Sequence, residues 1–111
     1  MKTIAIAAVA AGAALIVAVS AFAATPTFKG TVGPGFTITM ASKPTKAGKI
    51  RLVITDKSSI HNFHLTGPGV NVKTSVAKVG STTFTVTLKK GTYRFICDPH
   101  ASSMKGSFKV S

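Results

Sequence analysis

The segment from Gly91 to Val110 constrains this chain most, because it places three kinds of metal-binding residue between two strand-like patterns. It contains the chain's only cysteine, Cys97, a histidine three positions later and, four positions further on, Met104. Alternating apolar residues precede and follow these three residues. Thiolate, imidazole and thioether are the soft and borderline ligands that copper selects. The segment therefore predicts a copper-binding loop between two strands.

Strand geometry indicates how these ligands can converge. Successive side chains of a strand point to opposite faces, so Tyr93, Phe95 and Cys97 share one face. If the two aromatic rings point into a core, Cys97 also points inward, at the end of the strand. Pro99 then interrupts the strand, because it has no backbone N–H and a fixed φ. The turn can return His100 to the thiolate, which would give one loop three ligands of a trigonal copper site with a long axial thioether.

A fourth ligand has to come from elsewhere, and the remaining histidines are His61 and His64. By strand alternation, Phe63 and Leu65 share a face with His61, whereas Asn62 shares the other face with His64. The apolar face is the core face, which makes His61 the inward candidate and His64 a surface residue. A bulge in this strand would let the two histidines exchange roles.

Other interpretations of the same residues have to be weighed. A lone cysteine is more often a buried, inert thiol, although an odd cysteine in an exported chain also suggests a metal ligand. Zinc is the nearest alternative metal because it binds thiolate and imidazole. It does not usually bind a thioether, so Met104 favours copper. Asp98 is best interpreted as a turn-forming residue only.

Taken together, these motifs resemble the plastocyanin-like type 1 (blue) copper proteins, the cupredoxins. The pattern is His-Asn in an upstream strand, then Y-x-F-x-C-x-P-H and, after a short gap, M-x-G-x-F-x-V, within residues 36–110. The resemblance implies one copper ion whose ligands are His61, Cys97, His100 and Met104. It also implies that Asn62 ties the upstream histidine to the cysteine loop. The gap between His100 and Met104 holds three residues, unlike that of plastocyanin or amicyanin, so the resemblance fixes the axial bond and the reduction potential least.

The rest of the chain predicts a small all-β domain. Apolar residues alternate with threonine, lysine or arginine in short segments, and glycine and proline punctuate the chain between them. The expected strands are an edge strand at 27–32 and further strands at 36–40, 50–55, 60–65, 70–76, 83–88, 92–97 and 106–110. Seven or so short strands at regular spacing predict a β-sandwich with Greek-key connections. No segment after residue 23 shows a helical period.

Residues 1–23 predict a secretory signal peptide that forms a helix ahead of the domain at 24–111. The segment has a basic start at Lys2, an uncharged alanine-rich run and the A-x-A arrangement of Ala21-Phe22-Ala23, which places cleavage after Ala23 or Ala24. An uncleaved membrane anchor is the alternative, because residues 3–24 are just long enough to cross a bilayer. In both cases we expect an exported domain, in the periplasm, at the cell envelope or outside the cell.

The charge indicates what kind of partner the domain meets. The chain has 14 basic and 2 acidic residues, and removal of Lys2 with the signal leaves a net charge of +11. The basic residues are scattered and the aromatic residues look like core, so nucleic acid is not an expected partner. The charge predicts either solubility by repulsion or attraction to an acidic redox partner or an anionic membrane surface.

The leading functional hypothesis is a monomeric carrier of single electrons that cycles copper between Cu(II) and Cu(I). The alternative is a copper-binding protein for storage, delivery or tolerance. Delivery sites usually expose several methionines or histidines for transfer of the ion, and this chain has few. We do not expect an enzyme, because the sequence offers no acid–base pair and no second metal cluster.

Overall fold

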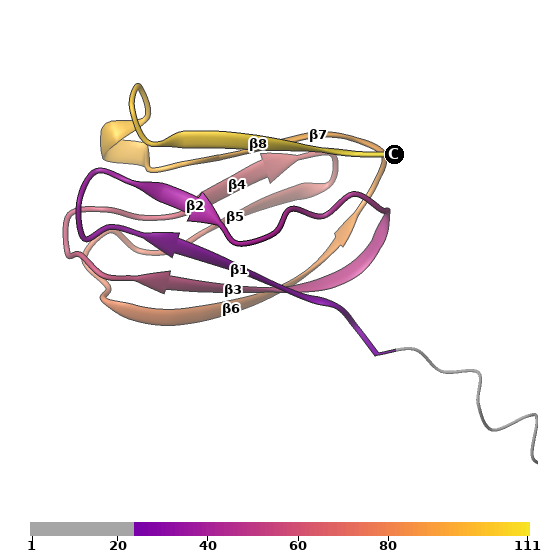
Figure 1. The fold of residues 1–111 in the computed structure, drawn as a ribbon, viewed down its shortest axis with the longest axis horizontal. Helices are drawn as coiled ribbons and strands as arrows, with labels where there is room; N and C mark the ends of the chain where they lie inside the picture. Colours follow the sequence, from indigo (N-terminus) through magenta and orange to yellow (C-terminus); the bar gives the residue numbers. More distant parts are fainter. Residues whose placement is uncertain (1–23) are drawn as a thin grey trace, which may run out of the picture.

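The computed structural model describes residues 24–111, which form two four-stranded sheets packed face to face (Figure 1). One sheet has the strand order β2-β1-β3-β6 and the other has the order β5-β4-β7-β8. The strands are β1 (Thr27–Val32), β2 (Ile38–Met40), β3 (Gly48–Asp56), β4 (His64–Gly67), β5 (Val70–Lys73), β6 (Gly80–Leu88), β7 (Gly91–Ile96) and β8 (Lys105–Val110). The predicted all-β sandwich is thereby confirmed, while the predicted signal helix lies outside the described residues.

Strand β1 is not the edge strand that the sequence suggested. It pairs with β3 in parallel, from Thr27 opposite Arg51 to Val32 opposite Asp56. On its other side it pairs with β2 in antiparallel fashion, with Thr31 opposite Thr39. The Gly/Pro-rich turn after β1 reverses the chain and places β2 beside β1, on the side away from β3.

The core lies between the sheets and is built from residues that alternate inward along the strands. In β3 the buried side chains are Ile50, Leu52 and Ile54, and in β7 they are Tyr93 and Phe95. The outward residues between them are Arg51 and the half-buried Val53 in β3 and Arg94 in β7, and this alternation is the pattern of a sheet with one solvated face. The alternation predicted for these two strands is confirmed.

Aromatic stacking stabilises the β5-β4-β7-β8 sheet near the C-terminal end of β7. The ring of Phe63 stacks on that of Phe95 with the centroids 5.4 Å apart. Gly106 lies opposite Phe95 across the β7–β8 pair, and a Cβ atom at this position would collide with the ring. The glycine therefore makes room for Phe95, two residues before Cys97.

Two elements begin later than the alternation suggested. Strand β2 starts at Ile38, so Phe36 lies in the preceding turn, 62% exposed, instead of in a half-buried strand. Strand β4 starts at His64, so residues 61–63 are not part of a ladder. Among residues 24–111 the only helix is the single 3₁₀ turn η3 (Asp98–His100), and no helix there is long and apolar enough to cross a membrane.

Candidate metal centre

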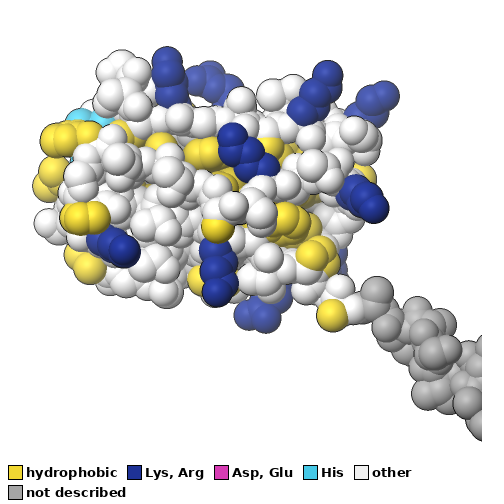
Figure 2. Space-filling model, in the orientation of Figure 1, with side chains coloured by type: hydrophobic (Ala, Val, Ile, Leu, Met, Phe, Trp, Pro, Cys, Tyr) yellow, Lys and Arg dark blue, Asp and Glu magenta, His cyan; other side chains and the backbone are white. Residues whose placement is uncertain are grey.

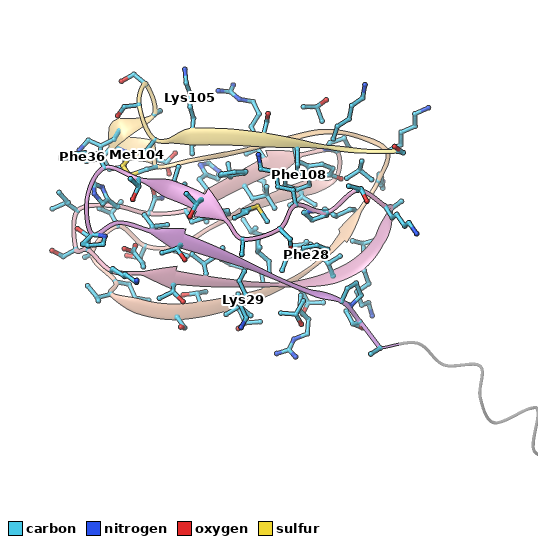
Figure 3. The ribbon with its side chains drawn as sticks, in the orientation of Figure 1. Phe28, Lys29, Phe36, Met104, Lys105 and Phe108 are labelled. Atoms are coloured by element: carbon cyan, nitrogen blue, oxygen red, sulfur yellow. The ribbon has the colours of Figure 1, made fainter. Side chains whose placement is uncertain are left out.

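Three loops meet at the end of the sandwich opposite the C-terminus (Figure 1). They are the turn at 33–37, the segment at 57–63 between β3 and β4, and the segment at 97–104 between β7 and β8. Figure 3 shows Phe36 and Met104 at this end of the molecule. The loops bring together residues that lie far apart in the sequence.

The donor atoms of His61, Cys97 and His100 form a compact triangle at this end. The two histidine Nδ1 atoms are 3.1 Å apart. Cys97 Sγ is 3.7 Å from His61 Nδ1 and 3.6 Å from His100 Nδ1. Among the described residues, this is the only group of three or more histidine, cysteine or acidic side chains close enough to share one metal ion.

The size of the triangle fits a transition-metal ion. A point equidistant from the three donor atoms lies about 2.0 Å from each of them, since this is the radius of the circle through a triangle with sides of 3.1, 3.7 and 3.6 Å. Bonds from zinc to imidazole nitrogen are about 2.0–2.1 Å and to thiolate sulfur about 2.3 Å. One thiolate with two imidazoles in a trigonal plane is the donor set of blue-copper sites. The residues present therefore fit a type 1 copper ion.

Backbone hydrogen bonds fix the thiol at the start of the loop. The Cys97 N–H donates to the Met104 carbonyl at 3.0 Å, which closes the loop. The His100 N–H donates to the Cys97 carbonyl at 3.0 Å and so forms the η3 turn. Cys97 Sγ is fully buried and accepts the Asn62 backbone N–H at 3.4 Å. A thiolate at this position would be stabilised by that donor.

His61 is fully buried, and its Nδ1 atom faces the other two donors. Its Nε2 atom has no hydrogen-bond partner among residues 24–111. His61 points inward as the sequence predicts, but strand alternation does not account for this position. Asn62, expected on the solvent face, is also buried, because the strand alternation applies only from His64 onward.

His100 is half-buried and lies under an aromatic ring that the sequence did not single out. The Phe36 ring contacts His100 edge-on, with centroids 4.9 Å apart, and His61 with centroids 5.2 Å apart. Figure 2 shows a histidine side chain among hydrophobic side chains at this end of the molecule. The only signal in the sequence was a large aromatic residue directly after the Gly33-Pro34-Gly35 turn.

Met104 is 1% exposed, and its N–H donates to the His100 carbonyl at 2.8 Å. Its backbone therefore joins the turn that carries His100 to the start of β8. Figure 3 places its side chain at the same end of the sandwich as Phe36. The thioether is therefore buried beside the turn that carries His100, and its role as a copper ligand stays a prediction.

His64 lies apart from the three donors and makes two hydrogen bonds of its own. Its Nδ1 atom is 2.8 Å from Asp98 Oδ1, and its Nε2 atom is 2.7 Å from Asn71 Oδ1. Burial lowers the pKa of His64, but the hydrogen bonds to Asp98 and Asn71 and the charge of Asp98 outweigh burial and raise it above the ordinary 6.5. His64 is thus half-buried and paired, rather than the solvent-facing residue that alternation suggested.

Asp98 does more than form a turn, which corrects the sequence-based interpretation. Asn62 Nδ2 donates to Asp98 Oδ2 at 2.8 Å, and the Asp98 N–H donates to Asn62 Oδ1 at 2.7 Å. Burial raises the pKa of Asp98, but the hydrogen bonds from Asn62 and His64 and the nearby positive charges prevail and lower it below the ordinary 3.8. Asp98 therefore links His64 to the residue that contacts the thiol.

Known proteins share this fold. A family model described as a cupredoxin-like domain matches residues 5–110. Reduced rusticyanin is 24% identical with a TM-score of 0.60, over 81% of this chain and 82% of that one. Reduced auracyanin from Roseiflexus castenholzii is 21% identical with a TM-score of 0.56, over 80% and 99% of the two chains. An amicyanin variant in its Cu(I) form is 17% identical with a TM-score of 0.52, over 77% and 82%. No curated protein sequence matches the chain.

Proposed function

The chain belongs to the cupredoxin-like domain family, and from this premise we propose that it binds one type 1 copper ion and carries single electrons. His61, Cys97 and His100 would hold the ion in a trigonal plane, with Met104 as a weak axial ligand. When bound, the ion supplies a Cu(II)/Cu(I) couple. The observation that carries this proposal is the triangle of one sulfur and two nitrogen atoms, whose size matches a single ion.

The surrounding residues support electron transfer because they restrain the donors before any metal is present. The Cys97 N–H donates a hydrogen bond to the Met104 carbonyl, and the Asn62 N–H donates one to the Cys97 sulfur. His61 is enclosed completely, and Phe36 packs against both imidazoles. Donors that cannot move apart offer both oxidation states nearly the same geometry, so little reorganisation accompanies the transfer.

His100 is the expected route for the electron between the metal and the surface. Of the four proposed ligands it alone is half-buried, whereas His61, Cys97 and Met104 are at most 1% exposed. A redox partner that docks at the loop end of the sandwich would therefore approach the ion most closely through this imidazole. The exposed Phe36 lies beside it and would be part of the same contact.

A role in copper storage or delivery has less support from the site. Transfer of an ion from one protein to another requires ligands that an incoming protein can replace. Here three of the four proposed ligands are enclosed, and the described residues contain no additional exposed histidine or methionine beside His100. The burial thus favours transfer of electrons over transfer of the ion.

The charge supports an acidic redox partner. The chain has 14 basic and only two acidic residues, and of these Asp56 is 2% exposed and Asp98 is paired with His64, so basic side chains dominate the surface. Figure 2 shows lysine and arginine side chains spread over the visible face. Such a field would steer a negatively charged partner. The proposed carrier is a monomer, and the segment at 1–23 would direct its export.

Voltammetry of the copper-loaded protein tests this function. An electron carrier should give a reversible one-electron wave, and copper should stay bound through repeated cycles. His61→Ala is the matched control, because it removes one donor from the triangle and should abolish the wave. Copper that leaves the protein on reduction would contradict the carrier role and favour delivery.

A further inference from the structure

A continuous chain of hydrogen bonds runs from His64 to the thiol of Cys97, and nothing in the proposed copper ligation requires it. His64 Nδ1 contacts Asp98 Oδ1, and Asp98 Oδ2 accepts from Asn62 Nδ2, both at 2.8 Å. The Asn62 backbone N–H then donates to Cys97 Sγ at 3.4 Å. Each link joins segments that are more than thirty positions apart in the sequence.

The network leaves Asn62 no freedom to turn. Its Nδ2 group donates to Asp98 Oδ2 and to the Thr74 carbonyl at 3.2 Å, while its Oδ1 atom accepts the Asp98 N–H. The neighbouring Phe63 N–H donates to Thr74 Oγ1 at 2.9 Å. The side chain of Asn62 therefore fixes the backbone whose N–H points at the thiol, and Asp98 is its main anchor.

His64 completes the network as a charged donor. Both of its ring nitrogens lie within 2.8 Å of an oxygen atom, on Asp98 and on Asn71. A neutral imidazole has only one N–H, whereas the imidazolium can donate to both oxygens. With an oxygen atom at each ring nitrogen, the arrangement suits a protonated His64 beside an ionised Asp98, which directly follows Cys97.

We propose that His64 is a positioning residue for the metal loop, which holds Asp98 on Asn62 and compensates the Asp98 charge beside the bound copper. The inference rests on the copper site proposed above. It assigns a role to a histidine that is not a ligand. When His64 loses its proton, one of its two hydrogen bonds is lost and the Asp98 charge is no longer balanced. An uncompensated negative charge favours Cu(II) over Cu(I), so the reduction potential should fall as the pH rises through the His64 titration.

Few charged groups surround His64, so its effect on the reduction potential can be separated from theirs. Lys73 lies opposite it on β5, Asp98 faces it from η3, and its partner on β7 is the uncharged Ile96. Lys73 keeps its charge throughout the range in which a histidine titrates. At a pH between the His64 pKa of the Cu(II) form and that of the Cu(I) form, His64 would bind one proton from the solvent for each electron that the redox partner delivers. The reduction potential therefore cannot change by more than about 59 mV for each tenfold change in proton concentration.

The experiment measures the reduction potential of the copper-loaded protein between about pH 6 and pH 9, together with the His64 titration by ¹⁵N NMR in the Cu(I) form. The unsubstituted protein should show a falling potential over the interval in which His64 titrates. His64→Asn, whose amide can still donate to Asp98 but cannot titrate, should retain the visible spectrum and lose the slope. Lys73→Gln, the matched control, should keep the slope. A slope that persists in His64→Asn, or a flat potential across the His64 titration, would overturn the proposal.

A second measurement does not depend on copper. In the metal-free protein, the amide signal of Asn62 should follow the His64 titration, and in His64→Leu this amide should exchange with deuterium at least about tenfold faster. The positioning role would be contradicted, even if the copper site is real, by an Asn62 amide whose signal does not follow the His64 titration and whose exchange rate is unchanged in His64→Leu. Failure of the copper assignment itself would be seen separately, as a parent protein that forms no coloured complex with Cu(II).

Discussion

The Nδ1 atoms of His61 and His100 face each other across 3.1 Å although 39 positions separate the two residues in the sequence. Two nitrogen lone pairs at this distance repel each other unless a proton or a metal ion lies between them. Cys97 Sγ completes the triangle. The fold thus holds three donors in an arrangement that a single cation stabilises.

The first prediction separates the two upstream histidines. His61→Ala should abolish the coloured copper site, because it removes one corner of the triangle. His64→Ala should keep the colour and change only how the potential depends on pH, since His64 contacts Asp98 and not the donors. Visible spectra of both variants with Cu(II) provide the measurement. Loss of colour in His64→Ala alone would mean that the two residues have been assigned the wrong way round.

The second prediction concerns the axial ligand. Met104→Leu should retain the coloured site and raise its reduction potential, because a thioether donates more electron density to Cu(II) than an alkyl group does. A swap of similar volume usually costs less than about 1.5 kcal/mol of stability, so the variant should fold. Met40→Leu, in β2, is the matched control and should leave the potential unchanged. Equal potentials for Met104→Leu and the parent would indicate that Met104 packs without coordinating.

The third prediction concerns stability and pH in the metal-free protein. The pKa of His64 is raised, so its contribution is fully present below pH 6.5 and is lost as the pH rises through the His64 pKa of the folded protein. The pKa of Asp98 is lowered, so its contribution is present above pH 3.8 and is lost as the pH falls through its pKa in the folded protein. A pair with side chains 18% and 38% exposed should contribute about 0.2–1 kcal/mol, the range of solvent-screened ion pairs.

Urea unfolding at pH 6 and pH 9 measures this contribution. The parent protein should lose more stability between these two pH values than His64→Asn does. Comparison of the two proteins removes the contributions of all other groups, which both share. An identical loss in both proteins would show that the pair does not stabilise the fold.

The fourth prediction concerns the partner. Electron exchange with an acidic redox protein should be fast at low ionic strength and slow steeply with added salt, because steering can raise association rates by about 10 to 10³-fold. Screening becomes strong at 0.1 M salt, where the Debye length is about 10 Å. The visible spectrum should not move in the same titration, since the proposed ligands are largely enclosed. A rate that does not depend on salt would assign the lysines to solubility or surface attachment.

The sequence predicted the part of the site whose residues are local. Cys97, His100 and Met104 lie within one loop, and the inward position of Cys97 follows from the alternation of Tyr93 and Phe95 in β7. The sandwich was predictable for the same reason, because apolar residues alternate with polar ones along β3, β6 and β7.

The contacts that the sequence did not predict depend on irregular segments. Alternation assumed a ladder through residues 60–65, but β4 starts only at His64, so Asn62 turns inward. The contact of Asp98 with His64 joins residues 34 positions apart and has no local signature. The sequence predicts Phe36 in a strand, whereas it lies in the turn and packs on the imidazoles of His61 and His100.

A titration of the metal-free protein with Cu(II) tests most directly whether Cys97, with two histidines, holds copper in a trigonal plane. We expect an intense visible band from charge transfer between thiolate and copper, which saturates at about one ion per chain. The band should be absent from Cys97→Ser, which keeps a small polar side chain at the same position. A parent protein that binds Cu(II) without this colour would contradict the assignment.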